Sequence, residues 1–478
     1  MASEELRDLP PIDRLLSQWE SELSGLPRPL LLRSLRGTLT RVRQELLDGS
    51  FSRRGTSVKA FVQNGGLREE VLAEIRRLRE PRHQSLINAT GVLLHTGLGR
   101  APLSDSAVDA VARIARYGLV EIDPVSGVRG RRELFVRDLL TDLTLAEEAT
   151  VVNNNAGAVM LMLAALAKGR EVIVSRGELV EIGGGFRVPE VMVQSGAVLV
   201  EVGTTNRTRL QDYEAAIRPE TAMLLQVHPS NFKVIGFTEA PPLVDLVNLG
   251  QARGLMVCSD LGSGYLRRYS GLEFLQEPTV QETLASGADV VCFSGDKMLG
   301  GPQSGILIGK SEPVLRIRRH PQFRALRPDK MTLAALEATL IAHRESGEDP
   351  PLSIPFFQQL TASLDTLRWR ASRVVDSVRA SLGTDSPLLL AVVDSLAQVG
   401  SGSVPGLQFP SIALSIPAPG SMADRLAEWL RVGSPRVFCR VSEGHVFLDL
   451  RTVFEEEDEA LIGALKALAQ RARADRPA

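Results

Sequence analysis

The sequence predicts an α/β protein in which a mainly parallel sheet is covered by helices on both faces. Short runs rich in valine and isoleucine alternate with helix-sized gaps through the middle of the 478-residue chain, a pattern typical of parallel sheets. A helical region precedes this part and a mixed region follows it. The length also exceeds what one hydrophobic core ordinarily supports, so we expect several domains.

The middle of the chain, residues 85–345, is the expected large α/β domain. Most gaps between its strand candidates show helical periodicity. The strand candidates are Glu171–Val174, Ala197–Val202, Ala222–Val227, Leu255–Ser259 and Asp289–Phe293.

Two smaller regions flank this domain. Apolar residues recur at helical spacing from Leu15 to Glu80, so residues 1–84 are expected to form a small helical domain and a linker. Residues 346–478 open with a segment rich in glycine and proline and mix helical with strand patterns, which predicts a small α+β domain. Its expected elements are a helix over Gln358–Ser381 and strands over Val437–Val441 and His445–Leu450.

Composition narrows the compartment and the partners. The 55 Lys and Arg residues balance 57 Asp and Glu residues, so the chain as a whole has no attraction to DNA or to an anionic membrane. No apolar stretch approaches the roughly 20 residues of a membrane span, and the N-terminus has no secretory pattern. Cys258, Cys292 and Cys439 are far apart without CxxC spacing, which argues against disulfides and zinc. We expect a cytoplasmic protein without a bound metal.

Lys297 is the most informative residue of the middle region. It follows the buried strand Val290–Phe293 on a polar, glycine-flanked turn, at the edge where open α/β sheets bind ligands. Such a lysine forms an imine with an aldehyde cofactor when its surroundings lower its pKa. A solvated lysine that pairs with Asp296 is the competing interpretation.

Asp260 ends the strand one βαβ step before Lys297. The two side chains should therefore lie side by side at one sheet edge. Pyridoxal phosphate (PLP) requires such a pair, because a buried carboxylate keeps its pyridine nitrogen protonated. PLP is thus the cofactor that the residues favour.

The phosphate of the cofactor would bind at the start of a helix. Asn155, Ala156 and Gly157 open an apolar helix, whose first backbone N–H groups are suited to an anion. A tight turn with an asparagine cap is the alternative. Ser294 could add a hydroxyl to the phosphate, and Ser230 could reach the ring or the substrate.

The helical N-terminal region is strongly basic although the chain is neutral. Its basic residues include Arg33, Arg36, Arg41 and Arg43. A solvated helix face is the ordinary explanation of such a cluster, and binding to an RNA backbone is the functional alternative.

Several long motifs resemble one known family. They are LPPIDRLL (Leu9–Leu16), INATGVLLHTGLGRAPLS (Ile87–Ser104), SRGELVEIGGGFRVPEVMVQSGAVLVEVGTTNRT (Ser175–Thr208), VHPSNFKVIGFTE (Val227–Glu239), SGDKMLGGPQSGILIGK (Ser294–Lys310) and HPQFRALRPDKMTLAALEATL (His320–Leu340). Together they resemble the bacterial selenocysteine synthases, the L-seryl-tRNA(Sec) selenium transferases of PLP fold type I. The resemblance runs from near the start to about Leu340 and thins beyond it.

The resemblance implies conversion of L-seryl-tRNA(Sec) to L-selenocysteinyl-tRNA(Sec) with selenophosphate. Lys297 would carry PLP in a Schiff base, β-elimination of water would give an aminoacrylyl-tRNA, and selenium would then add. Asp296 would belong to the active site, and Arg100, Arg324 and Arg327 would bind the anionic donor, a role that suits the guanidinium fork. A basic loop is the alternative for the last two arginines. The resemblance also implies tRNA binding by the N-terminal helices and a homodecamer built as a pentamer of dimers.

Two other functions compete with this one. A PLP-dependent lyase for a small phosphorylated amino compound would use the same Lys297 and Asp260, but it would not need the helical N-terminal region. A catalytically inactive tRNA-binding relative would not need the lysine, the aspartate and the three arginines together. His228 is either an ordinary loop histidine or a catalytic one, and Gly183–Gly185 with Arg187 is either a flexible loop or a gate for substrate.

Overall fold

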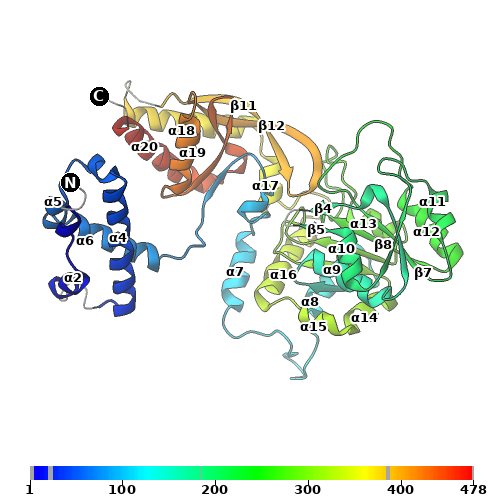
Figure 1. Ribbon diagram of the computed structural model, residues 1–478. Coiled ribbons are helices and arrows are strands. Elements are labelled where there is room, and N and C mark those ends of the chain that lie inside the picture. Colours follow the sequence, from blue (N-terminus) through cyan, green and yellow to red (C-terminus); the bar gives the residue numbers. More distant parts are fainter. Residues whose placement is uncertain (1–4, 20–24, 183–184, 384–387, 476–478) are drawn as a thin grey trace. The chain divides into compact units, whose positions relative to one another are not determined.

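The computed structural model describes residues 5–19, 25–182, 185–383 and 388–475. The chain folds into two compact units, Met1–Ser85 and Leu86–Ala478, which we call the helical unit and the α/β unit (Figure 1). Gly183 and Gly184, part of the suggested gate, lie outside the described residues. The domain boundary expected near residue 345 remains a prediction.

The helical unit packs around one small apolar core. Leu35, Leu39 and Val42 of its longest helix are fully or almost fully buried, and they meet Val71 of another helix. The apolar spacing along both helices explains this packing, because residues three and four apart share a helix face. The helices of this unit are α2 (Ile12–Gln18), α4 (Arg28–Leu47), α5 (Val58–Gln63) and α6 (Gly66–Arg79), with 3-10 turns at Leu6–Asp8 and Ser50–Arg54.

A seven-stranded sheet forms the centre of the α/β unit. Its strands run in the order β2 (Glu148–Val152), β10 (Gly305–Gly309), β9 (Val290–Ser294), β8 (Met256–Gly262), β7 (Thr221–Val227), β3 (Glu171–Ser175) and β6 (Val198–Val202). All neighbours pair in parallel except β10, which is antiparallel to both β2 and β9. The predicted mainly parallel sheet is confirmed, and each predicted middle strand is present within a few residues.

Helices cover both faces of this sheet. Residues that alternate along the strands divide between separate apolar clusters, as the two-residue repeat of a strand requires. One face packs against α9 (Asn155–Leu166), α10 (Val188–Ser195) and α14 (Ser311–Arg319). The other face packs against α8 (Leu134–Thr144), α11 (Leu210–Ala216), α12 (Leu243–Arg253), α13 (Val280–Ala285) and α16 (Lys330–Glu345). Smaller elements are α7 (Asp105–Ile114), α15 (Pro321–Ala325) and the ribbon β4 (Glu181–Ile182) with β5 (Phe186–Arg187).

A second sheet of five strands has its own core. Its order is β1 (Ile87–Ala89), β13 (Val437–Ser442), β14 (His445–Asp449), β12 (Ser403–Pro417) and β11 (Ala391–Gly400). β1 pairs in parallel with β13, although most of the chain separates them. The helices packed here are α18 (Leu364–Leu382), α19 (Met422–Val432) and α20 (Asp458–Ala474), and α17 (Pro355–Thr361) precedes them.

The predicted helix over Gln358–Ser381 is wrong as one element. It is divided into α17 and α18, and Ser363 caps the second helix by accepting a 3.1 Å hydrogen bond from the backbone N–H of Thr366. A serine at this position satisfies an N–H group that a new helix leaves unpaired. The apolar periodicity continues across the break, so it hides the cap.

Candidate active site

Lys297 lies on a tight turn after the carboxyl end of β9. The side chain is only 5 % exposed, and the turn is held by the carbonyl of Lys297, which accepts a hydrogen bond from the N–H of Gly300 at 2.9 Å. Burial lowers the pKa of the Lys297 amine, while the charge of Asp260 acts in the opposite direction. The lowered pKa supplies more unprotonated amine, the form that attacks a carbonyl carbon.

Asp260 lies on β8, in register with Cys292 on β9. Its carboxyl is buried, and Oδ1 accepts a 2.9 Å hydrogen bond from Nδ2 of Asn155. Burial raises the pKa of the Asp260 carboxyl; the Asn155 bond and the charge of Lys297 act against that shift. Asp260 and Lys297 thus lie close enough for each charge to affect the other's pKa.

The space beside Lys297 has polar atoms without partners, and two glycines of positive φ, Gly262 and Gly264, border it. A Cβ added to Gly262 would lie 3.8 Å from Nζ of Lys297 and 3.9 Å from Oγ of Ser230. Gly264 must be glycine, because its φ is +71° and a Cβ would lie 2.3 Å from the carbonyl oxygen of Ser294. Among the described residues, no partner reaches the buried Oγ of Ser263 or Oδ1 of Asn155. Such orphaned polar atoms are typical of a site that binds a polar ligand.

The start of α9 differs in detail from the expected phosphate site. Oδ1 of Asn154 already accepts a 2.7 Å hydrogen bond from the N–H of Gly157, so the asparagine cap is present and uses one of the predicted donors. Asn155 directs its side chain toward Asp260 instead. Ala156 is exposed in the first turn.

Arg100 reaches the lysine turn. Its Nη1 donates a 2.7 Å hydrogen bond to Oδ2 of Asp296, and the carbonyl of Asp296 accepts a bond from the N–H of Ala101 at 3.2 Å. The backbone of Arg100 has a φ of +64°, a left-handed conformation that costs energy in a non-glycine residue and is common at functional sites. Arg100 and Asp296 therefore form one ion pair beside Lys297.

Arg324 and Arg327 have no described contact with the Lys297 turn, unlike Arg100. Arg324 is exposed on α15, and Nη1 of Arg327 lies 3.7 Å from Oε1 of Glu121. The segment between them does touch the start of α9, because the carbonyl of Leu326 accepts a 2.8 Å hydrogen bond from the N–H of Asn153. Neither guanidinium has a described contact with Lys297.

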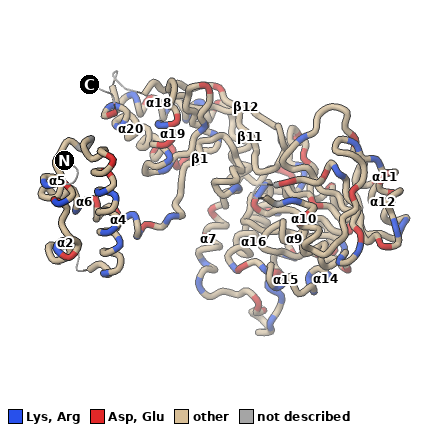
Figure 2. Tube along the Cα trace, viewed as in Figure 1, with Lys and Arg blue, Asp and Glu red and all other residues tan. Residues whose placement is uncertain are grey.

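The four arginines predicted for tRNA are all exposed on α4, a helix along which several basic positions can be followed in Figure 2. Arg33, Arg36 and Arg43 share one side of the helix by their spacing, opposite the buried leucines. Nη2 of Arg41 forms a 3.0 Å bond with Glu70 on α6. The helical unit thus presents a basic face.

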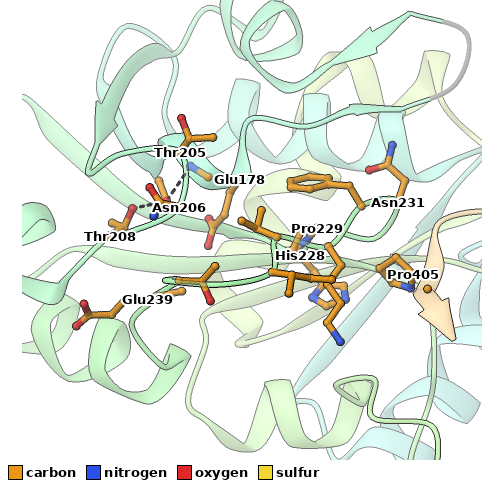
Figure 3. Close-up of a pocket in the computed structure, with 18 of the residues that line it drawn as sticks. Glu178, Thr205, Asn206, Thr208, His228, Pro229, Asn231, Glu239 and Pro405 are labelled. Atoms are coloured by element: carbon orange, nitrogen blue, oxygen red, sulfur yellow. Dashed lines mark hydrogen bonds between the residues drawn. The ribbon is translucent and has the colours of Figure 1, made fainter.

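A cavity of about 1020 Å³ opens at the ends of β3 and β7. Its walls include Glu178 and His228 (Figure 3), and Glu277 as well. Residue-by-residue reasoning missed both acids and left His228 undecided. Their burial was the missing information, since an isolated glutamate in a sequence is ordinarily expected on the surface.

Comparison with known proteins identifies the family. A family model described as SelA, L-seryl-tRNA selenium transferase, matches residues 86–454. The L-seryl-tRNA(Sec) selenium transferase of Geotalea uraniireducens (strain Rf4) is 44% identical, covering 97% of this chain and 99% of that protein. The enzyme of the same name from Desulfomicrobium baculatum is 45% identical, covering 97% and 99%.

A solved structure supports the fold. D-glucosaminate-6-phosphate ammonia-lyase superposes with a TM-score of 0.57 at 21% identity, covering 82% of this chain and 97% of that chain. The predicted fold class, PLP-dependent fold type I, is confirmed. The family match also continues well past Leu340, where the motifs thin. With relatives above 40% identity over nearly its full length, the chain belongs to the L-seryl-tRNA selenium transferase family.

Proposed function

We propose that this chain converts L-seryl-tRNA(Sec) to L-selenocysteinyl-tRNA(Sec), with selenophosphate as the selenium donor. In the net reaction, selenium replaces the β-hydroxyl oxygen of serine, and the phosphoryl group leaves as inorganic phosphate. The observation that carries the proposal is a buried lysine of lowered pKa next to a buried aspartate, in a member of this family.

PLP fits the residues around Lys297. Asp260 would pair with its ring nitrogen, held in place by the bond from Asn155, and the unpaired hydroxyl of Ser263 would find an acceptor. Ser294, Ser230 and the first N–H groups of α9 are the candidates for its remaining polar atoms. When bound, PLP withdraws electrons from the α-carbon of an attached amino acid.

The side chains at the Lys297 turn would transfer the proton and hold the selenium donor. Lys297, as a free amine, would remove the α-proton of serine and return it after selenium has been added. Arg100 would hold the anionic donor, and Asp296 fixes the direction of its guanidinium through the 2.7 Å bond. Arg324 and Arg327 would complete the anion site when the substrate is present. Positioning of the donor by such charges replaces a random encounter by a fixed approach.

An absorbance spectrum tests the reaction class. The purified protein should show the visible band of lysine-bound PLP, and the band should shift with seryl-tRNA(Sec) but not with free serine. Lys297→Ala should lack the band. The control is Lys310→Ala, which removes a lysine that follows β10 and pairs with Asp289; it should retain the band. A band that ignores the tRNA would favour the small-molecule lyase, and a protein without the band would fit the inactive tRNA-binding relative.

We also propose that the helical unit binds the tRNA. Arg33, Arg36 and Arg43 on one face of α4 suit the RNA backbone, where charge and shape matter more than base edges. The wild-type chain should bind the tRNA with a steep salt dependence. Replacement of all three arginines by glutamine should weaken that binding without changing the cofactor band.

A homodecamer, a pentamer of dimers working in the cytoplasm, completes the proposal. Exposed apolar side chains gather between α7 and α8, as an assembly surface would require; they are Tyr117, Leu119, Ile122, Val125 and Val128. Light scattering should give a mass ten times the 51.9 kDa of one chain. A monomer in solution would contradict this assembly.

A further inference from the structure

The cavity at the ends of β3 and β7 lies directly beside the lysine turn. His228 lines it, and the backbone N–H of His228 donates a 2.9 Å hydrogen bond to the carbonyl of Asp260. Pro229 and Asn231 also line it, and Ser230 between them approaches the same point near Gly262 as Nζ of Lys297. The segment from His228 to Asn231 therefore connects the cavity wall with the surroundings of Lys297.

The buried carboxyls of the cavity wall are those of Glu178 and Glu277, while the exposed residues Arg207, Lys233 and Glu239 line it as well. Glu178 is 8 % exposed and Glu277 is 2 % exposed. Oε1 of Glu277 lies 3.1 Å from Nε2 of His228, but their orientation does not make a hydrogen bond, and both atoms lack a partner among the described residues. Buried acceptors without donors favour a ligand that supplies N–H or O–H groups.

The two buried acids can offer different hydrogen-bonding groups to a ligand. Burial raises the pKa of the Glu178 carboxyl to about 8, so at neutral pH this group is mostly protonated and can donate as well as accept a hydrogen bond. The anionic selenium donor has its proposed place at Arg100, whose guanidinium lies at the lysine turn.

The remaining walls suit a flat, partly apolar group. Phe232 and Phe274 present aromatic rings, and Val404 and Leu407 come from β12 of the second sheet. Aromatic side chains beside a single-stranded nucleotide commonly stack on its base. A volume of about 1020 Å³ is ample for one nucleoside.

We propose that this cavity receives the 3′-terminal adenosine of the aminoacylated tRNA. The inference rests on the proposed function, in which serine is esterified to the ribose of that nucleoside. The adenine amino group and the free ribose hydroxyl supply donors for the two acids, and Phe232 or Phe274 packs on the base. The ester then places serine on the side of Ser230 and Lys297.

Photocrosslinking tests the inference without altering the protein. Seryl-tRNA(Sec) that ends in 8-azidoadenosine is bound to the wild-type holoenzyme, irradiated and digested, and the modified peptides are mapped by mass spectrometry. Crosslinks within residues 228–240 or 274–277 are expected. Crosslinks confined to other parts of the chain would overturn the assignment of the cavity.

A matched pair of variants adds a kinetic test. Glu277→Gln should raise the KM for seryl-tRNA about 10-fold, the effect of losing one hydrogen bond to a charged group, with kcat and the KM for selenophosphate little changed. The control is Glu273→Gln, an exposed residue of the same loop, which should leave both constants unchanged. Equal KM values for the two variants and the wild type would contradict the inference. Absence of turnover in the wild type would instead remove the proposed function itself.

Discussion

The α/β unit contains buried pairs of opposite charge, and two of them differ in how well their hydrogen bonds are satisfied. Arg370 on α18 bonds both carboxyl oxygens of Asp458, at 2.7 and 3.1 Å, and also the carbonyl of Val453 at 2.9 Å. Lys297 and Asp260 are buried to a similar extent, yet no hydrogen bond joins them within the described residues. Burial instead raises the pKa of Asp260 and lowers that of Lys297, so it favours the neutral form of each group.

The difference separates a structural pair from a reactive one. An ion pair whose donors and acceptors are satisfied recovers part of its desolvation cost and fixes two elements together. A pair left short of partners keeps groups that can exchange protons and bind a ligand. The same two residue types can therefore hold a fold or perform chemistry, and hydrogen bonding decides between the two.

The largest effect is expected at the reactive pair. Lys297→Ala should reduce turnover about 10⁴-fold or more, because the residue is the proposed nucleophile and base. The free energy of unfolding of the cofactor-free protein should not fall, because the variant removes a buried amine without a good partner. Urea unfolding followed by circular dichroism measures this, and a marked loss of stability would make Lys297 a structural residue.

The opposite result is expected at the structural pair. Arg370→Ala should lower the free energy of unfolding by about 3–5 kcal/mol, since it leaves the buried carboxylate of Asp458 uncompensated. Arg373→Ala, on the same helix and 4.0 Å from the exposed Glu459, should cost less than about 1 kcal/mol. Similar losses for the two variants in chemical denaturation would contradict the distinction.

Glu178 extends the comparison to a buried acid with no cationic partner among the described residues. Its pKa is about 8 in the folded protein against 4.5 ordinarily, so between these values the folded chain keeps a proton that the unfolded chain releases. Glu178 should therefore make stability fall with rising pH in this window, by up to about 1.4 kcal/mol per unit. Glu178→Gln should remove that contribution. Parallel slopes for variant and wild type in this window would show that Glu178 is already ionised.

The smallest effect is expected for single exposed charges. Arg36→Ala should weaken tRNA binding a few-fold. The slope of the logarithm of the binding constant against the logarithm of the salt concentration should become smaller by about 1, as loss of one phosphate contact predicts. Arg319→Ala, an exposed arginine of α14, is the control and should do neither. Binding measured over a series of salt concentrations distinguishes them, and an unchanged slope for Arg36→Ala would place the RNA elsewhere.

The sequence predicted the parts of the fold in which local pattern and tertiary environment agree. Four of the five middle strands are mostly buried apolar runs, because both faces of the sheet are covered there; β6, at the end of the strand order, is more exposed and contains Glu201. Strands β11 and β12 were not among the predicted elements; glycines and prolines interrupt the apolar pattern of β12, and the pairing of the two strands has an irregularity between Gln398 and Gly400. β10 was missed as well, since the glycines at its ends, Gly305 and Gly309, look like turn residues in the sequence.

The candidate site was predictable to the extent that it lies on strand ends. Lys297, Asp260 and Asp296 follow buried strands, so topology alone brings them to one edge. Asn155 was assigned to a phosphate, but its side chain supports Asp260, a contact between residues far apart in sequence. Glu178 and Glu277 depend on burial by distant segments, which no local pattern records.

The pairing of β1 with β13 has a consequence for synthesis on the ribosome. Ile87 lies early in the α/β unit, but its backbone N–H bonds the carbonyl of Arg436, near the end of the chain. The strand therefore has no sheet partner until almost all of the protein has been made, and contacts of such long sequence separation form slowly. Arg100 follows this strand closely, so the anion-binding side of the site should be the last part to be ordered in a newly made chain.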